Sequence, residues 1–440
     1  MSSSGSNETE TEPTARSDRR SIIFGAMGTV VEWYDFVVYA YLAAIISPLF
    51  FPTESDAASL VATFGVFAAG YAMRPLGGLF FGNLGDRVGR RKTLLLSITM
   101  MTIPMVVMGF LPTYDDIGIW APILLTLVRL IQGFSVGGEY TGVLTLLLED
   151  APRERRGLVT AFGAFTSGGG SVLAALVVLA MTATLTAEQE SDWGWRAAYW
   201  LGAAMAVTVL VLRTMVRETP QFEELKKRHE LVKLPIIHAI REYPGRILVA
   251  FAVTGYMGIC TYYVMYFPTY AQTEGGIENW QTLIVMTIVA AFFSFTAPAF
   301  GALSDRVGRR PMLLGSTCVF PIIAVPVFLL IREGNFWLLL LGSFLFVLPV
   351  TAFTGAFVSA VGELFPTRER YSGLAIGYNF GSAALGGTAA LVAQSLVTAT
   401  GNSLAPSWYV IVASLVIIPI IWRMKETARV PMSQIGLKDK

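Results

Sequence analysis

A ten-residue segment occurs twice in this chain and constrains the fold more than any other feature. Gly82–Arg91 reads GNLGDRVGRR and Gly301–Arg310 reads GALSDRVGRR, so eight of the ten residues are identical. The copies lie 219 residues apart, half the length of the 440-residue chain, and each lies between two long apolar runs. Two weaker similarities keep nearly the same spacing, between Glu149–Gly157 and Glu363–Gly373 and between Arg217–Pro220 and Lys425–Ala428. The chain is therefore predicted to contain two similar membrane halves, as transporters do.

The apolar residues are grouped in runs long enough to cross a lipid bilayer. The chain is 54% hydrophobic and 14% charged, whereas soluble domains carry about 25% charged residues. A crossing helix needs about 20 mostly apolar residues. The predicted fold class is an all-α integral membrane protein with two pseudo-symmetric six-helix halves. Its twelve predicted spans are residues 21–49, 57–82, 93–111, 119–147, 158–184, 194–213, 246–270, 279–301, 312–331, 335–361, 372–398 and 404–424.

Basic residues are concentrated in alternate loops. The loops that begin near residues 53, 114, 188, 274, 331 and 401 contain one basic residue, Arg332. Cytoplasmic loops collect Lys and Arg, so both termini are predicted to be cytoplasmic and the chain to lie in the inner (cytoplasmic) membrane. The basic loops contain Arg87, Arg90, Arg91, Lys92, Arg153, Arg155, Arg156, Lys226, Lys227, Arg228, Arg306, Arg309, Arg310, Arg368 and Arg370.

These spans and loops predict five segments. Polar residues 1–20 are expected to form a disordered cytoplasmic tail. Residues 21–213 form the N-terminal half, 214–245 a cytoplasmic linker, 246–424 the C-terminal half and 425–440 a second cytoplasmic tail. The lipid bilayer is the expected partner of both halves, and a monomer is expected.

Several function classes lack support in the sequence. The net charge of +1 argues against nucleic-acid binding. No nucleotide-binding G-x-x-x-x-G-K-[ST] segment and no G-x-S-x-G nucleophile turn is present. No cofactor or metal site is expected, and the protein is not expected to be an enzyme. Any energy for transport must therefore come from an ion gradient.

The repeated loop is similar to the signature of a known transporter family. The pattern G-x-x-x-D-R-x-G-R-R between the second and third spans, repeated before the ninth, resembles the major facilitator superfamily. Further segments resemble its metabolite:proton symporters, which include permeases for 2-oxoglutarate, citrate, shikimate, and proline or betaine. These segments are Gly28–Phe36, Arg74–Gly78, Gln132–Gly142 and Trp193–Arg196.

Within this resemblance, two features favour a carboxylate substrate. The chain ends about 16 residues after the last predicted span, too few for the C-terminal coiled coil of the proline/betaine osmosensors. Arg129 stands where some betaine carriers have Lys. The main expectation is proton-coupled symport of a small organic acid by alternating access. The alternatives are a proline/betaine:proton symporter and, in another class, a membrane sensor built on a carrier fold.

Charged residues inside the predicted spans are the candidate site. A charge at mid-bilayer costs at least ~2.5–3.5 kcal/mol, so such residues are functional candidates. At ~1.5 Å per helical residue, Asp35, Glu32 and Arg129 reach a similar depth near the midplane. Arg74 and Glu139 both fall in the cytoplasmic third and are expected to pair.

Each of these residues has a functional and a structural interpretation. A carboxyl in a poorly solvated cavity exchanges its proton within the physiological range, which makes Asp35 or Glu32 the expected proton carrier. Arg129 stays charged and can hold a substrate carboxylate through two parallel hydrogen bonds. The structural alternative is a buried ion pair that fixes packing. The predicted substrate-binding residues are Arg129, Gln132, Arg74, Tyr262, Tyr266 and Asn379.

The repeated loop is expected to control the conformation. The resemblance implies that Asp86 and Arg90 belong to a charge network that holds the inner face closed. Glycine clusters in the fourth, fifth and eleventh spans are expected to allow close helix approach. The residues assigned to the conformational motif are Gly82, Asp86, Arg87, Arg90, Arg91, Asp305, Arg306 and Arg309.

Overall fold

A computed structural model describes residues 19–53, 56–215, 218, 223, 235–367, 369–431 and 434–435. Most of the predicted N-terminal tail and linker, and part of the C-terminal tail, therefore lie outside the described residues. Within the described ranges the secondary structure is helical and contains no strand. A helix forms its backbone hydrogen bonds within itself. Lipid offers no hydrogen-bond partners to backbone groups, so a helical chain suits a membrane.

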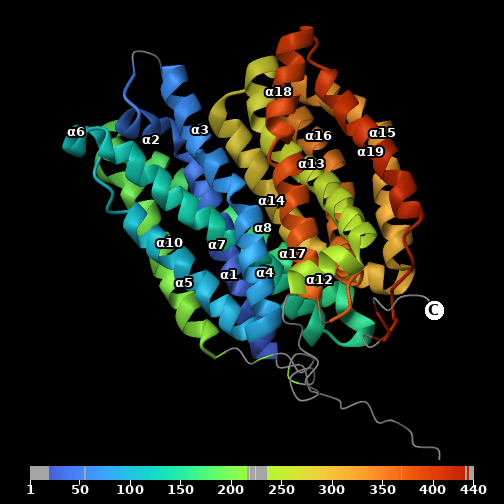
Figure 1. The fold of residues 1–440 in the computed structure, drawn as a ribbon. Coiled ribbons are helices and arrows are strands. Elements are labelled where there is room, and N and C mark those ends of the chain that lie inside the picture. The colour runs from blue at the N-terminus through green and yellow to red at the C-terminus, as the bar shows by residue number, and fades with distance from the viewer. Residues whose placement is uncertain are drawn as a thin grey trace, which may run out of the picture.

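The N-terminal half is a bundle of long helices joined by short ones (Figure 1). Its elements are α1 (Arg19–Tyr41), α2 (Ala43–Phe50), α3 (Asp56–Ala72), α4 (Arg74–Val88), α5 (Arg90–Met108), α6 (Tyr114–Ile117), α7 (Trp120–Asp150), η1 (Arg153–Arg155), α8 (Arg156–Thr184), α9 (Ala187–Gln189), η2 (Glu190–Gly194) and α10 (Trp195–Arg213).

The C-terminal half repeats this arrangement beside it, coloured yellow to red in Figure 1. Its elements are α12 (Pro235–Glu242), α13 (Pro244–Gly275), α14 (Asn279–Val307), α15 (Arg309–Arg332), α16 (Phe336–Gly362), α17 (Arg370–Gly381), η3 (Ser382–Gly386), α18 (Ala389–Thr400) and α19 (Ala405–Trp422). Each half packs around its own large apolar core; the C-terminal core also takes in Tyr140 and Leu144 of α7.

The repeated loop has the same backbone conformation in both halves. Gly89 separates α4 from α5 with φ 112° and ψ 157°, and Gly308 separates α14 from α15 with φ 111° and ψ 157°. Side chains other than glycine rarely adopt such a positive φ. The sequence repeat is therefore a structural repeat. We call the face that carries these two turns and the starts of α8 and α17 the basic face; it lies at the bottom of Figure 1.

Ten helices of the described chain are long and apolar enough to cross a membrane. The other two predicted spans, 21–49 and 57–82, contain the intramembrane charges Glu32, Asp35 and Arg74. The structure divides the first at Leu42 and the second at Met73. The predicted all-α membrane fold is confirmed.

The halves contact each other most extensively along two helix pairs, α8 with α14 and α4 with α17. Glycines make the first contact close, since a Cβ added at Gly301 would lie 2.4 Å from the carbonyl oxygen of Gly157. Small residues of this kind allow the backbones of membrane helices to approach.

Candidate functional site

A cavity of about 240 Å³ lies between the two halves. It starts near the middle of the bundle and extends away from the basic face, because α1 contributes Glu32 to Tyr41 and α13 contributes Thr254 to Pro268, and both helices begin at the basic face. Among the described residues that line it, Glu32 and Arg74 are charged. Its walls are rich in aromatic rings, namely Trp33, Phe36, Tyr41, Phe67, Tyr71, Tyr140, Tyr262, Phe293, Phe357 and Tyr378.

Glu32 of α1 and Arg74 of α4 lie next to each other in the wall of this cavity. Glu32 Oε1 lies 3.6 Å from Arg74 Nη2, and both side chains are buried. Arg74 Nη1 donates a hydrogen bond of 2.7 Å to the hydroxyl of Tyr71. Both Glu32 oxygens and Arg74 Nε have no hydrogen-bond partner among the described residues. The pair is therefore close but not joined by a hydrogen bond.

Asp35 and Arg129 form a separate buried pair behind the cavity wall. Arg129 Nη1 donates to Asp35 Oδ2 at 2.8 Å, and Gln132 Nε2 lies 3.3 Å from Asp35 Oδ1. Arg129 also donates to the hydroxyl of Tyr199 at 2.9 Å and lies 4.0 Å from the ring centroid of Tyr39. These residues are not among those that line the cavity. Asp35 meets Arg129 as expected, whereas Glu32 meets Arg74.

The expected pairing of Arg74 with Glu139 is wrong. Arg213, at the end of α10, holds Glu139 through both guanidinium nitrogens, with Nη1 at 2.6 Å from Oε2. Ser97 donates to the same carboxylate at 2.7 Å. The depth of a residue along its helix did not predict this pairing. Arg213 is the last residue of its predicted span, a position that indicates the membrane surface.

The predicted C-terminal wall of the cavity is partly different from the observed one. Tyr262 lines the cavity, with its ring edge-to-face against Tyr71 at 5.7 Å between centroids. Tyr266 is not among the residues that line the cavity; its ring packs at a tilt against those of Tyr263 and Tyr270 in the C-terminal core. Asn379 donates to the carbonyl of Gly137 at 2.9 Å, so its amide joins the two halves.

Three residues not predicted from the sequence complete the site. Trp33 Nε1, Thr254 Oγ1 and Thr261 Oγ1 line the cavity, and each lacks a hydrogen-bond partner in the described structure. A buried polar atom without a partner costs about 1–3 kcal/mol, so such atoms mark a place where a ligand or water binds. Thr254 and Thr261 are seven residues apart on α13, which puts both on one face. The seven-residue spacing of Thr254 and Thr261 is visible in the sequence and was the available indication that both could line one cavity.

The two repeated loops each hold the other half through an aspartate. Asp86 Oδ2 accepts a hydrogen bond of 2.8 Å from the backbone N–H of Ser372, at the start of α17. Asp305 accepts hydrogen bonds from the backbone N–H groups of Gly157 at 2.8 Å and Leu158 at 2.9 Å, at the start of α8. Each aspartate therefore accepts a hydrogen bond from the half to which it does not belong.

The other motif residues surround these contacts. Gly82 packs closely on α17, since an added Cβ would lie 3.0 Å from that of Ala375. Arg87, Arg91 and Arg306 are exposed. The side chain of Arg90 lies outside the described part, but its counterpart Arg309 donates to Asp305 at 2.8 Å.

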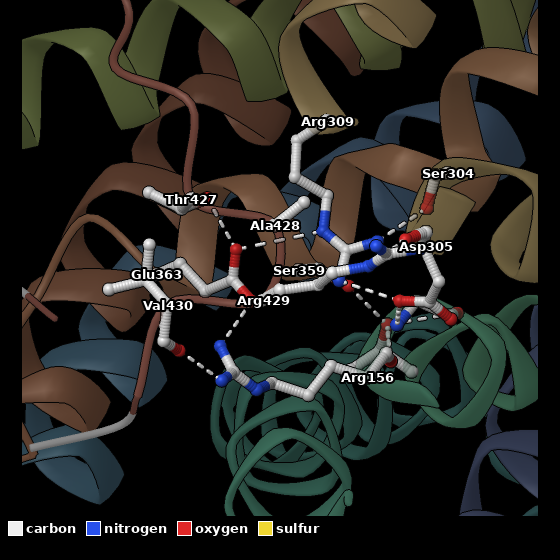
Figure 2. Close-up of polar contacts among 12 residues, drawn as sticks. Arg156, Ser304, Asp305, Arg309, Ser359, Glu363, Thr427, Ala428, Arg429 and Val430 are labelled. Carbon is white, nitrogen blue, oxygen red and sulfur yellow. Dashed lines mark hydrogen bonds and ion pairs between the residues drawn. The ribbon is translucent and has the colours of Figure 1, made fainter. Parts of the chain in front are cut away.

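A charge network joins the halves around Asp305 (Figure 2). Arg156 Nη1 donates to Glu363 Oε1 at 2.9 Å, and Arg309 Nε lies 3.6 Å from Glu363 Oε2. Thr427 donates to the same Glu363 carboxylate. Arg156 belongs to the N-terminal half. Arg309 and Glu363 belong to the C-terminal half and Thr427 follows it, so the network closes the basic face.

The chain after α19 takes part in this closure. Residues Glu426–Val430, here called the C-terminal segment, cross the basic face beside the network (Figure 2). Glu426 accepts hydrogen bonds from the backbone N–H groups of Arg309 at 2.9 Å and Arg310 at 3.0 Å. Two carbonyl groups of the segment accept hydrogen bonds from the N-terminal half, that of Arg429 from Arg153 and that of Val430 from Arg156.

The chain is similar to characterised transporter families over most of its length. Residues 144–407 match the family described as MFS/sugar transport protein, and residues 21–238 match that of the sugar (and other) transporters. The chain is 35% identical to the proline/betaine transporter of Escherichia coli (strain K12), covering 94% of this chain and 85% of that protein. It is 36% identical to the glycine betaine/proline/ectoine/pipecolic acid transporter OusA of Dickeya dadantii (strain 3937), covering 94% and 84%.

Solved structures show the same fold. The proton:xylose symporter XylE bound to 6-bromo-6-deoxy-D-glucose matches with a TM-score of 0.78 at 19% identity, over 94% of this chain and 98% of that one. Among the described residues, no group of three or more His, Cys, Asp or Glu side chains is placed to hold a metal ion.

Proposed function

The chain belongs to the major facilitator superfamily, in the family of the proline/betaine transporters, and we propose that it takes up a small zwitterion of the proline or betaine type together with protons. The substrates named for the relatives share one chemistry, a carboxylate beside a cationic nitrogen. The observation that carries the proposal for this chain is the cavity, whose described charged residues are one acid, Glu32, and one base, Arg74.

Among its described lining residues, the cavity offers one cation, Arg74, to the carboxylate end of a zwitterion. That carboxylate fits the guanidinium of Arg74, which can form two parallel hydrogen bonds to it.

The aromatic walls fit the cationic end of such a substrate. Quaternary and secondary ammonium groups bind over the faces of Trp and Tyr rings, by about 0.5–2 kcal/mol for each favourable contact. Trp33, Tyr71 and Tyr262 line the cavity near Glu32 and Arg74. This arrangement can hold the ammonium group without a second carboxylate.

The expectation of a carboxylate metabolite loses its main support. That expectation relied on Arg129 as the clamp for a substrate carboxylate. The guanidinium of Arg129 donates to Asp35 and to Tyr199, behind the cavity wall. The two relatives described above are named as proline and betaine transporters, which favours the alternative.

Proton coupling is supported by the buried acids Glu32 and Asp35 within α1. The abundance of Lys and Arg in the loops at the basic face supports a cytoplasmic location for that face. The contacts that close it, and the cavity on its far side, then correspond to an outward-facing state. Alternating access would break these contacts and expose the cavity to the cytoplasm. The membrane that the protein spans would be the inner membrane of a bacterium.

The test is uptake by the purified protein in liposomes. The panel is proline, glycine betaine, 2-oxoglutarate, citrate and shikimate, each with an imposed proton or sodium gradient. We expect accumulation of proline or glycine betaine that needs the proton gradient and stops with an uncoupler. Uptake of the organic acids without proline or betaine would overturn the substrate class, and sodium dependence would overturn proton coupling. Absence of all transport would favour a sensor.

A further inference from the structure

The Glu32–Arg74 pair differs from the other buried ion pairs in the described ranges, because neither oxygen of its carboxylate accepts a hydrogen bond there. Arg129–Asp35, Arg156–Glu363 and Arg309–Asp305 have nitrogen–oxygen distances of 2.8, 2.9 and 2.8 Å and are hydrogen-bonded. The Glu32–Arg74 distance is 3.6 Å, and neither carboxylate oxygen of Glu32 has a hydrogen-bond partner among the residues that the structure describes. Burying an ion pair is tolerated when geometry and further hydrogen bonds compensate the loss of hydration. This pair is the poorly compensated one, and it is the one at the cavity.

The surroundings of Glu32 leave Arg74 as the group that sets its charge. Glu139 of α7 and Arg213 of α10 pack against Gly28, one turn below Glu32, but these two neutralise each other. The other titratable groups that face Glu32 in the described structure are the phenol hydroxyls of three helices. They are Tyr71 of α3, Tyr140 of α7 and Tyr378 of α17. From α8, Ser167 and Ser171 line the cavity.

We propose that a substrate carboxylate and Glu32 compete for Arg74, so that the substrate binds tightly only when Glu32 has taken up a proton. In the empty site Arg74 balances the Glu32 carboxylate. When the substrate carboxylate takes Arg74, an ionised Glu32 would be left buried without a counter-charge, at a cost of several kcal/mol. Protonation removes that cost. This inference deepens the proposed function and rests on its assumption of a substrate that carries a carboxylate.

The exchange leaves no buried carboxylate without a counter-charge at either stage. The empty site holds one anion and one cation. The loaded site holds neutral Glu32, the substrate carboxylate on Arg74 and the substrate cation over the rings of Trp33, Tyr71 and Tyr262, so the one positive charge that it gains is that of the proton. One proton from the medium binds to a Glu32 oxygen with each substrate, and it leaves when the carboxylate departs and Arg74 turns back to Glu32. Coupling between proton and substrate thus needs one arginine shared by two carboxylates.

The direct test is the pH dependence of substrate affinity. For the wild-type protein in detergent, the affinity for the substrate found in the uptake panel should fall with rising pH, approaching about tenfold per pH unit above the titration of Glu32. Glu32→Gln should have a pH-independent affinity, close to the value that the wild type reaches at low pH. It should also exchange substrate across liposomes without accumulating it. Monodisperse elution and an unchanged melting temperature check that Glu32→Gln is folded.

Two outcomes would overturn the inference. One is accumulation by Glu32→Gln against a substrate gradient; the other is a wild-type pH slope in that variant.

A third measurement tests Arg74 with choline, which has the cationic end of betaine but no carboxylate. The double variant Glu32→Gln/Arg74→Gln should bind betaine no better than choline, whereas Glu32→Gln should prefer betaine at least tenfold; equal preferences in the two variants would remove Arg74 from recognition. If proline and betaine are not taken up but another carboxylate is, the proposed substrate class is rejected. The competition for Arg74 is then tested with the carboxylate that the protein does transport.

Discussion

The carboxylate of Asp86 accepts a hydrogen bond of 2.8 Å from the backbone N–H of Ser372, and this contact joins the two halves of the protein. Ser372 lies in the first turn of α17, where backbone N–H groups have no partner within the helix. A negative charge is favoured at such a helix end. Asp305 makes the pseudo-symmetric contact at the start of α8. Each copy of the repeated loop therefore caps a helix of the opposite half.

Asp86→Asn should shift the protein toward the state that is open at the basic face. A hydrogen bond to a charged group contributes about 1.5–3 kcal/mol and one between neutral groups about 0.5–1.5 kcal/mol. The expected loss of about 1 kcal/mol changes the ratio of the two states by about fivefold. The measurement is labelling of single cysteines, placed on either side of the cavity in a variant without Cys260 and Cys318.

The control is Asp115→Asn, which changes an exposed carboxylate on α6, at the opposite end of the bundle. It should leave both accessibilities unchanged. Asp305→Asn should shift the protein in the same direction, because Asp305 accepts two backbone hydrogen bonds from α8 and one hydrogen bond from Arg309. An altered ranking of substrates in Asp86→Asn would show that the residue belongs to the substrate site instead.

Asp35→Asn should lower stability more than it changes coupling. The substitution leaves the Arg129 guanidinium buried without its counter-charge, which costs about 3–5 kcal/mol. The double variant Asp35→Asn/Arg129→Gln should recover most of this loss. The readouts are the melting temperature in detergent and the amount of protein in the membrane. A stable Asp35→Asn that exchanges substrate but does not accumulate it would assign the coupling proton to Asp35 instead of Glu32.

Removal of the C-terminal segment should loosen the basic face. A chain that ends at Lys425 loses the carbonyl groups that accept from Arg153 and Arg156, and the carboxylate of Glu426 at the start of α15. Accessibility of cysteines on the basic side of the cavity should increase several-fold. The matched control ends at Pro431 and keeps the segment. Equal accessibility in the two truncations would show that the segment does not contribute to closure.

Gly133→Ala should destabilise the N-terminal half, although alanine favours a helix over glycine by about 1 kcal/mol. A Cβ at Gly133 would lie 1.7 Å from the carbonyl oxygen of Gly70, so α3 and α7 would have to separate. Overpacking of this kind costs about 1–3 kcal/mol. Gly169→Ala is the control, because nothing lies within 4 Å of its added Cβ. The melting temperature should fall in the first variant and not in the second; no difference would mean that the α3–α7 contact adapts.

The sequence alone determined the class of the protein and the plan of its halves. Three features are properties of the sequence itself: the lengths of the hydrophobic runs, the basic residues in alternate loops and the repeated loop. They do not depend on which helices are in contact. Gly89 and Gly308 illustrate this, since they occupy the same position in the two copies of the loop and adopt nearly the same positive φ. Depth also follows from position in a span, so the approach of Asp35 to Arg129 was foreseeable.

Only the tertiary structure decided which charges pair. Glu32, Asp35 and Glu139 lie in spans that also bring Arg74, Arg129 and Arg213 into the membrane, and depth alone permits several pairings. The choice depends on the rotation of each helix about its axis and on its lateral neighbours. Packing of both halves sets these two properties together, so Arg213 holds Glu139 and leaves Arg74 to Glu32 at the cavity. For the same reason the partner of Asp86, a backbone group more than 280 residues away, was not visible in the sequence.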